Sequence, residues 1–458
     1  MRWATTVAVA VAVATAAAAY GAARYVDDPR DEAPRPAATG RQTLRALVVV
    51  SKKGHPTHPT WYHDAQLVER GGIITVAWNG DGETRAGQVR ADDFALLSKV
   101  RLNQGPLGGV TDSTGTDTDR HDVPAVVADG AGRLAFLYGG GSLAARGSAG
   151  PYVRRGSVAN AIDRLGAEQR LAIGDGAAFD FEAVTDAAGT VHLIGQHGRG
   201  RTGALVELRL GRDGTWLPPR VLIEGGLQPG GCVLDGRARG CNRFAIGRLA
   251  ADRATGRLHL VWGWSEDSLS GKCRTDAGFC DHDLMYAYSD DGGETWHNAG
   301  GGATVRVSDG PLQANAAPFR VVGGHVGLFK AVAAGPAGPL LIYTTFGGRG
   351  QSLMAARLVG GRWRSARVAE SRSGDAGWSG SLVLRGGAAY SLWTPTGDAI
   401  HSFTSADGVA WRHAVIYRGP AWSLTGAPSA RPHEQLLLWR GKQQGSHSWV
   451  MLGAAPAP

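Results

Sequence analysis

A unit of about sixty residues recurs along the chain and limits the fold more than any other feature. Each copy contains a short apolar strand, a turn rich in glycine or aspartate, and a strongly alternating strand that ends in an aromatic residue. The clearest copies are 63–81, 121–140, 180–198 and 242–264, and weaker ones are 315–347, 378–397 and 425–441. Repetition at this spacing indicates an array of β-sheets rather than one continuous sheet.

A second hairpin lies between many of these copies, and its turn ends in Gly-x-Trp or Gly-x-x-Trp. The segments are 211–216, 291–296, 360–363 and 407–411. Two hairpins give four strands per repeat. Seven such repeats predict an all-β fold, a seven-bladed β-propeller of four-stranded blades. The apolar segment 43–51 has no hairpin of its own, so we expect this N-terminal strand to complete the last blade and close the ring.

Composition supports this fold and narrows the choice of partners. The chain has 69 Gly and 14 Trp, and only 19% of its 458 residues are charged, as expected for many short strands and tight turns. The net charge is +8, but no Lys/Arg run with interleaved aromatics occurs, which argues against nucleic acid as a partner. The basic surface is either simply solvated or favours anionic ligands such as acidic polysaccharide.

The N-terminal segment has the pattern of an export signal. A positive charge at Arg2 precedes an apolar run from Trp3 to about Ala19, with cleavage expected after Ala22 or Ala23. An uncleaved N-terminal anchor is the alternative to a signal peptide over 1–23. Residues 24–40 then form a flexible linker, and 41–456 a single propeller domain without any other membrane span. The expected location is secreted, periplasmic or cell-envelope associated.

Four cysteines are present, and an even number in an exported chain predicts disulfides. Local pairing of Cys232 with Cys241 and of Cys273 with Cys280 is the simplest of the three connectivities. A structural metal held by Cys273, Cys280 and His282 is the alternative, but the spacing matches no common zinc pattern. We therefore expect no metal and no cofactor.

The segment 286–298 carries the pattern S-x-D-x-G-x-T-W, formed by Ser289, Asp291, Gly293, Thr295 and Trp296. A short Ser or Asp side chain can accept hydrogen bonds from the N–H groups of the following turn, and glycine permits positive φ there. The degenerate copies keep Gly and Trp and lose Ser or Thr. These residues are therefore expected to hold a turn and to pack a Trp, with no catalytic role.

This pattern is the Asp box of the bacterial neuraminidase repeat (BNR) proteins, which have a sialidase-like fold. The segments 120–140, 256–267 and 283–301 resemble one branch of them, the seven-bladed ulvan-type polysaccharide lyases and related propeller rhamnosidases. The resemblance spans roughly residues 62–301 and weakens afterwards. It implies activity on polysaccharides with rhamnose–glucuronate linkages, by lyase or glycoside hydrolase chemistry.

A propeller binds its ligand at one end of the central channel, where the innermost strands begin. The residues just before or at these strand starts form a polar and aromatic ring. Candidate catalytic residues are His121, His63, Tyr62 and Glu182. Candidate substrate-binding residues are Trp61, Asp64, Asp122, Asp180, His197, Asn242, Arg243, Asn315 and Trp378.

The resemblance also implies roles. In lyases of this type a His or Tyr removes the proton at C5, a cationic or amide group neutralises the uronate carboxylate, and a Tyr or His protonates the leaving oxygen. His121 occupies the family's His-x-x-Pro position and is the leading candidate for acid/base work. Three positions depart from the family: 139–141 is a Gly run in place of a second histidine, Phe179–Phe181 replaces a Tyr, and His197 replaces an Arg.

Two functions from different classes stay open. The first is an exported enzyme, a polysaccharide lyase or a glycosidase, that cleaves a glycan containing uronate or rhamnose. A glycosidase would use two carboxylates across the substrate. The second is a non-catalytic propeller of the cell envelope that binds a glycan or a protein. A sialidase is disfavoured because the first repeat has Tyr62–Asp64 and lacks the expected Arg motif. We expect a monomer with an oligosaccharide or polysaccharide as its partner.

Overall fold

The computed structural model describes the greater part of the chain from residue 44 onward. The described residues are 44–54, 65–80, 83–104, 123–139, 151–171, 173, 178–197, 203–224, 232–234, 237–239, 243–252, 254–265, 281–312, 317–335, 338–347, 350–371, 381–385, 389–428, 434–444 and 447–456. All of them belong to the second of two compact units, Pro36–Pro458. The predicted signal peptide 1–23 and linker 24–40 lie outside them. Among the described residues, no helix is long and apolar enough to cross a membrane.

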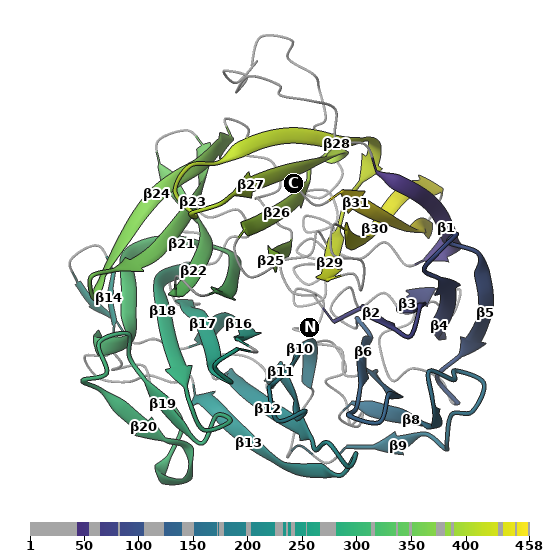
Figure 1. The fold of residues 1–458 in the computed structure, drawn as a ribbon. Helices are drawn as coiled ribbons and strands as arrows, with labels where there is room; N and C mark the ends of the chain where they lie inside the picture. Colours follow the sequence, from purple (N-terminus) through teal and green to yellow (C-terminus); the bar gives the residue numbers. More distant parts are fainter. Residues whose placement is uncertain are drawn as a thin grey trace, which may run out of the picture. The chain divides into compact units, whose positions relative to one another are not determined.

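The described strands form antiparallel blades around a common centre, as Figure 1 shows. Five blades are separate four-stranded sheets, and the strands from β16 to β24 form one nine-stranded sheet that we divide into a fourth and a fifth blade. The first blade is β2 (Leu67–Arg70), β3 (Ile73–Gly80), β4 (Glu83–Arg90) and β5 (Leu96–Arg101). The second is β6 (Ala125–Ala128), β7 (Arg133–Tyr138), β8 (Tyr152–Ala159) and β9 (Gln169–Arg170). The third is β10 (Ala178–Thr185), β11 (Val191–His197), β12 (Ala204–Leu210) and β13 (Trp216–Glu224).

The remaining four blades continue the same pattern around the ring. The fourth is β16 (Arg243–Ala251), β17 (Leu258–Ser265), β18 (Asp281–Ser289) and β19 (Thr295–His297). The fifth is β21 (Arg320–Gly335), β22 (Gly338–Gly347), β23 (Gly350–Val359) and β24 (Arg362–Ser371). The sixth is β25 (Ser381–Arg385), β26 (Ala389–Pro395), β27 (Gly397–Ser405) and β28 (Arg412–Ala421). The seventh is β29 (Leu424–Pro428), β30 (Glu434–Gln444), β31 (His447–Pro456) and β1 (Arg45–Gly54).

The N-terminal strand closes the ring, as the sequence predicts. β1 pairs antiparallel with β31, with Arg45 opposite Ala454 and Val49 opposite Met451. The innermost strands of neighbouring blades are in contact all the way round, including β29 with β2 across the closure. The all-β propeller prediction is therefore confirmed, and the first and last strands of the domain share one sheet.

The fourth and fifth blades are joined into one sheet. The first half of β21 pairs with β18, with His282 opposite His325, and the second half pairs with β22. The weaker sequence match near the fifth repeat reflects this long, shared strand. The short strands β14 (Cys232–Leu234), β15 (Arg237–Arg239) and β20 (Thr304–Arg306) and the 3-10 turns η2 (Val307–Asp309) and η3 (Ala317–Phe319) lie outside the four-strand pattern.

The core consists of seven apolar clusters, each shared by two neighbouring blades. The second strands are buried on both faces because each sheet packs between two others, and β3 is buried along nearly its whole length. The outer strands are more exposed, as in β5. The largest fully buried side chains are tryptophans, namely Trp78, Trp262, Trp264, Trp296, Trp393 and Trp439.

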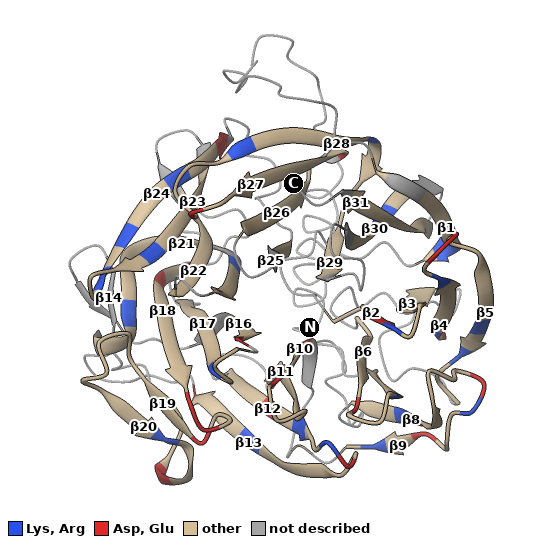
Figure 2. Ribbon diagram, viewed as in Figure 1, with Lys and Arg blue, Asp and Glu red and all other residues tan. Residues whose placement is uncertain are grey.

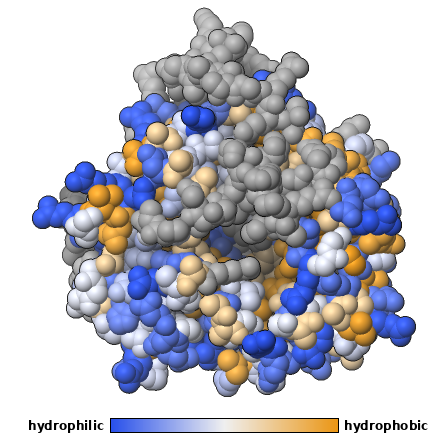
Figure 3. All heavy atoms as spheres, in the orientation of Figure 1, coloured by the Kyte–Doolittle hydropathy of each residue, from blue (hydrophilic) through white to orange (hydrophobic). Residues whose placement is uncertain are grey.

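Charge is distributed around the ring rather than gathered in one patch. Figure 2 shows Lys and Arg on several outer strands, including β24 and β28, with Asp and Glu mainly near turns. Over the face in Figure 3, hydrophilic and hydrophobic residues are interspersed. This distribution gives no support for a nucleic-acid surface on the described part of the chain.

Of the four cysteines, Cys232 begins β14, and its side chain is not described. Cys241, Cys273 and Cys280 lie outside the described residues. The two disulfides therefore stay predictions. The described residues contain no group of three His, Cys, Asp or Glu side chains that could hold a metal ion.

Candidate functional site

The two ends of the ring differ in what they carry. The first strand of each blade begins where the second strand ends, as shown by Ala178 opposite His197 and Arg243 opposite Ser265. We call this end of the ring the strand-start end. The hairpin turns between first and second strands, and those between third and fourth strands, lie at the other end, which we call the turn end.

The structure describes four of the predicted site residues, all at the strand-start end. Asp180 lies in β10 and Arg243 begins β16, with only their backbones described. Glu182 lies in β10 and is buried, and His197 ends β11 and is half-buried. The other nine lie outside the described residues: Trp61, Tyr62, His63, Asp64, His121, Asp122, Asn242, Asn315 and Trp378. Their roles stay predictions.

Three successive inner strands carry a β-bulge, and the first paired residue after each bulge is charged. The residues are Glu182 in β10, Arg248 in β16 and Lys330 in β21, opposite Ile194, Val261 and Tyr343. A bulge inserts an extra residue and so re-aims the side chains that follow it. The same device thus places a charged group at a corresponding point in the inner strands of blades three, four and five.

Arg248 links the Glu182 side chain to the backbone of Lys330 across these blades, and all three side chains are buried. Glu182 is 7% exposed, Arg248 1% and Lys330 0%. Arg248 Nη1 lies 3.5 Å from Glu182 Oε2, and Arg248 Nε donates to the Lys330 carbonyl at 3.2 Å. Lys330 Nζ donates to the Gly327 carbonyl at 2.9 Å. Two cations and one carboxylate are therefore held with little solvent contact, where electrostatic interactions are strong.

Sequence reasoning found Glu182 and missed Arg248 and Lys330. Both lie inside apolar stretches, 244–250 and 326–334, that read as ordinary core strands. A charged residue within such a stretch is rare in a core unless it is paired, and this is the signal that could have identified them. Their position depends on the bulges, which a period-two pattern does not reveal.

The strand-start end of the fourth blade carries a second polar group. His282 Nδ1 lies 3.2 Å from Asp283 Oδ2, and the Gly324 N–H donates to Asp283 Oδ1 at 3.1 Å. Asp283 has φ +53°, in the left-handed region that Asp adopts more readily than most non-glycine residues. His282 thus lies beside a carboxylate and opposite His325 of the next blade.

The turn end carries the Asp box, and its hydrogen bonds are local. The Ser289 hydroxyl donates to Asp291 Oδ1 at 2.7 Å and accepts from the Gly293 N–H at 2.8 Å. Asp291 Oδ1 also accepts from the Thr295 N–H at 2.8 Å. Trp296 is fully buried in the core shared by the third and fourth blades. Each of these residues thus contacts its own turn or the core.

A second complete turn of this kind occurs in the sixth blade. The Ser405 hydroxyl donates to Asp407 Oδ1 at 3.0 Å and accepts from the Gly408 N–H at 2.8 Å. Asp407 Oδ1 accepts from the N–H groups of Val409 and Ala410. The copy at 407–411 therefore retains the serine two residues before the aspartate, a feature that the sequence comparison overlooked.

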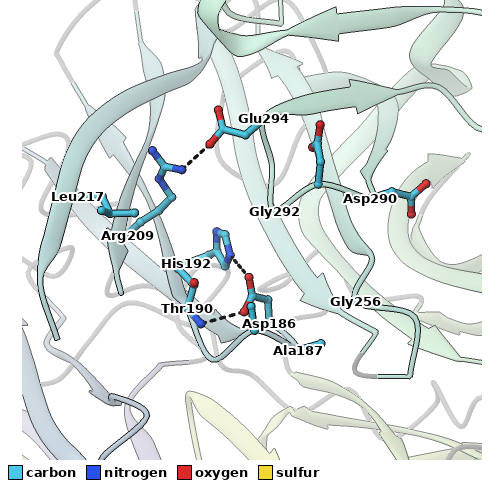
Figure 4. Close-up of a pocket in the computed structure, with 12 residues that line it drawn as sticks. Asp186, Ala187, Thr190, His192, Arg209, Leu217, Gly256, Asp290, Gly292 and Glu294 are labelled. Carbon is cyan, nitrogen blue, oxygen red and sulfur yellow. Dashed lines mark hydrogen bonds and ion pairs between the residues drawn. The ribbon is translucent and has the colours of Figure 1, made fainter. Parts of the chain in front are cut away.

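A groove of about 420 Å³ opens at the turn end between the third and fourth blades. Figure 4 shows Asp186, His192 and Arg209 on one side and Glu294 and Asp290 on the other. Arg209 Nη1 lies 2.6 Å from Glu294 Oε1 and so joins the third blade to the Asp box of the fourth. The groove lies at the opposite end of the ring from the predicted site.

A buried ionic network supports this groove from below. His192 Nδ1 lies 2.7 Å from Glu207 Oε1, and its Nε2 lies 3.0 Å from Asp186 Oδ2. Arg220 binds Glu207 and donates to the Gly292 carbonyl at 3.1 Å. Burial lowers the pKa of His192, but the two carboxylates outweigh burial and raise that pKa above 6.5. The network joins the blades without forming a nucleophile–base pair.

No family model matches this chain, and no curated protein matches it in sequence. Among solved structures, a PL25 ulvan lyase bound to -[GlcA(1-4)Rha3S]- is similar to it with a TM-score of 0.67 at 12% identity, over 90% of this chain and 96% of that chain. The polysaccharide lyase Uly1 gives a TM-score of 0.61 at 12% identity, over 91% and 100% of the two chains. At such identities the similarity establishes the propeller fold.

Proposed function

We propose that this chain is an exported carbohydrate-active enzyme that cleaves a polysaccharide containing uronate and rhamnose at the strand-start end of its channel. The observation that carries the proposal is the buried charged trio Glu182, Arg248 and Lys330, which three successive bulges place on the inner strands. Charge held in a low-dielectric wall suits an enzyme whose substrate develops charge during reaction. The fold shared with an ulvan lyase bound to a glucuronate–rhamnose sulfate saccharide supports the substrate class.

β-Elimination is the reaction that this set of residue types supports best. A base removes the C5 proton of the uronate, the C4–O bond breaks, and a C4–C5 double bond forms while the leaving oxygen gains a proton. His121 supplies acid/base chemistry in this proposal, with Tyr62 and His63 as the further proton donors or acceptors. A cation such as Arg243 neutralises the uronate carboxylate, which makes the C5 proton more acidic. We also propose that the chain belongs to the branch of Asp-box repeat proteins that contains the ulvan-type lyases.

Hydrolysis is the second catalytic route, and it requires two carboxylates on opposite sides of the glycosidic bond. Glu182 is the candidate for one of these carboxylates whose side chain the structure describes. The predicted partners are Asp64, Asp122 and Asp180. In this route no double bond forms, so the two reactions yield different products.

A non-catalytic, glycan-binding propeller is supported by a different observation. Glu182, Arg248 and Lys330 are almost fully buried, and Arg248 contacts both the Glu182 carboxylate and the Lys330 carbonyl. Such a set can stabilise the contacts between three blades without touching a ligand. Under this alternative the strand-start end binds saccharide and leaves it unchanged.

The same proposal includes an exported monomer. In this proposal the N-terminal pattern over 1–23 directs export of the chain from the cytoplasm. The two predicted disulfides would be stable in the oxidising environment outside it. The closure of the ring within this chain, where β1 pairs with β31 and β29 contacts β2, supports a monomer.

The test is incubation of the purified protein with a panel of acidic polysaccharides while ultraviolet absorbance and reducing ends are followed. A rise in both identifies a lyase, and new reducing ends alone identify a hydrolase. We expect His121→Ala to lower the rate at least about 100-fold, since general acid–base catalysis contributes this much or more. His297→Ala, a histidine at the turn end, is the matched control and should retain activity. Binding without cleavage across the panel would establish the non-catalytic alternative.

A further inference from the structure

Arg440 is the most unusual charged residue in the described part of the chain. Its side chain is 2% exposed, and its Nε, Nη1 and Nη2 atoms make no hydrogen bond within the described part of the chain. Its backbone is well bound, since its N–H donates to the Ser423 carbonyl and its carbonyl accepts from the Trp422 N–H, both at 3.0 Å. The unpaired guanidinium is therefore a property of the side chain and not of a distorted strand.

Strand geometry places this guanidinium between the seventh and first blades, at the strand-start end. Alternate residues of β30 face opposite sides. Leu436 and Leu438 pack in the core shared with the first blade, whereas Leu437 and Trp439 pack in the core shared with the sixth. Arg440 follows the first set. It lies beside Ser423, the residue just before β29 begins, so it is at the end where the predicted site lies.

The corresponding position of the first blade carries a small polar residue. Asn79 follows the buried Trp78 near the end of β3, as Arg440 follows the buried Trp439 near the end of β30. The Asn79 side chain is hydrogen-bonded within its own blade, since its Oδ1 accepts from the Thr84 hydroxyl at 2.8 Å. Arg440 departs from this pattern by bringing a full charge into the same position.

A buried cation without a partner is costly, because its hydration is lost and nothing replaces it. Burial lowers the pKa of Arg440 to about 10, so the guanidinium is still charged at neutral pH. The planar fork of a guanidinium matches the two oxygens of a carboxylate or sulfate. An oxyanion is thus the ligand that would offset the cost of burial.

Trp422 provides an independent indication of a sugar ligand. It lies two residues before β29 begins and binds the Arg440 carbonyl through its N–H, yet its own side chain is 40% exposed. Trp439, which precedes Arg440 in β30, is buried. An exposed indole offers a flat apolar face with a polar edge, which suits the face of a pyranose ring.

We propose that Trp422 and Arg440 of the seventh blade form a subsite for an anionic sugar residue, with Arg440 binding its carboxylate or sulfate and Trp422 covering its ring. This inference rests on the proposed function for the ligand class, a glycan. It goes further in assigning the recognition of charge to a blade far from Glu182, Arg248 and Lys330. A charged sugar at this position would be selected over a neutral one.

Calorimetric titration with glucuronate–rhamnose oligosaccharides tests the subsite, and the same oligosaccharides with carboxylates reduced to alcohols serve as matched neutral ligands. A sulfated neutral oligosaccharide distinguishes sulfate from carboxylate as the preferred group. The wild type should bind an acidic ligand at least about tenfold more tightly than the reduced one, the usual contribution of a charged hydrogen bond. Arg440→Met should remove this preference. Trp422→Ala should weaken the binding of the acidic and the neutral oligosaccharides by the same factor.

Thermal unfolding without ligand gives a second readout. Arg440→Met keeps most of the side-chain volume and removes the unpaired charge, so its unfolding midpoint should be higher than that of the wild type. Arg90→Met, which removes an exposed arginine 51% accessible at its side chain, is the control for net charge and should change neither readout. The unfolding midpoint is measured without ligand and is therefore independent of cleavage.

Three results would overturn the subsite. One is an Arg440→Met protein that keeps the wild-type preference for acidic ligand, which contradicts the subsite and leaves the proposed function intact. Another is an Arg440→Met protein that unfolds at a much lower temperature, which makes the arginine structural. A wild type that binds none of the oligosaccharides contradicts the subsite and the proposed function together. Trp422→Ala, an exposed change, remains informative if the Arg440 variant does not fold.

Discussion

Asp291 shows how much a single side chain contributes to a turn in this ring. Its carboxylate accepts hydrogen bonds from the Thr295 N–H and the Ser289 hydroxyl. Burial alone would raise the pKa of Asp291, but these bonds outweigh it and lower that pKa below 3.8. The ionised carboxylate therefore stabilises the fold above about pH 4, and this contribution is lost as the pH falls through the folded-state pKa.

Asp291→Ala should lower the free energy of unfolding by about 1–2 kcal/mol at neutral pH, because the turn loses its acceptor. Chemical denaturation measures this change. Asp290→Ala is the matched control in the same turn. Asp290 forms an exposed ion pair with Arg257 at 2.6 Å, so its loss should cost less than about 1 kcal/mol. Folded Asp291→Ala protein should keep its ligand and any activity. A variant as stable as the wild type yet inactive would show that the Asp box serves the site directly.

Contacts between elements depend on a different kind of residue, the buried ionic network between the third and fourth blades. His192 of β11 binds Glu207 of β12 and Asp186 of the neighbouring turn. Because the pKa of His192 is raised above 6.5, its stabilising contribution is complete below about pH 6.5 and is lost as the pH rises through the folded-state pKa.

His192→Gln should therefore be most destabilising in mild acid. We expect the loss of unfolding free energy to be about 1–3 kcal/mol near pH 5.5 and to shrink toward pH 9, as protonated histidine disappears from the wild type. Thermal unfolding of both proteins across this range measures it, with His297→Ala, whose imidazole is less enclosed, as the control. A difference that stays constant or grows with pH would contradict a protonated His192.

At the scale of elements, the sequence predicts what repeats and misses what does not. Recurrent Gly turns and buried tryptophans such as Trp78 and Trp439 mark the hairpins, because their spacing is set by blade geometry. The pairing of β18 with β21 had no such marker, since it depends on where an insertion lets the chain return. The sequence also did not predict the bulges before Glu182, Arg248 and Lys330, because a bulge is defined by the pairing of a strand with its partner strand.

The sequence predicts where the inner strands of a propeller start, but not which buried charged side chains lie beside them. Residues at the inner-strand starts follow from the propeller itself, and the structure places Glu182 and His197 at that end. Trp422 carries the same Trp-Ser pair as the predicted Trp378, so the repeat could have identified it. Arg440 could not have been singled out, because its meaning depends on burial without a partner, which only packing reveals.

At the scale of the whole molecule, the two ends of the ring differ in how their polar side chains are bound. The turn end carries the Asp box, the groove and the ionic network, and these residues bind one another across neighbouring blades. The strand-start end carries the charged trio, the His282–Asp283 pair and the unpaired Arg440. Polar side chains that form hydrogen bonds within the protein stabilise the fold. A buried charged group without a hydrogen-bond partner indicates a ligand. We therefore propose that glycan binds at the strand-start end.

The structure of the protein in complex with an acidic oligosaccharide tests this assignment most directly. We expect saccharide at the strand-start end, with a charged group against Arg440 and a ring against Trp422. Saccharide bound instead in the groove at the turn end, against Asp186, Arg209 and Glu294, with the strand-start end empty, would contradict it.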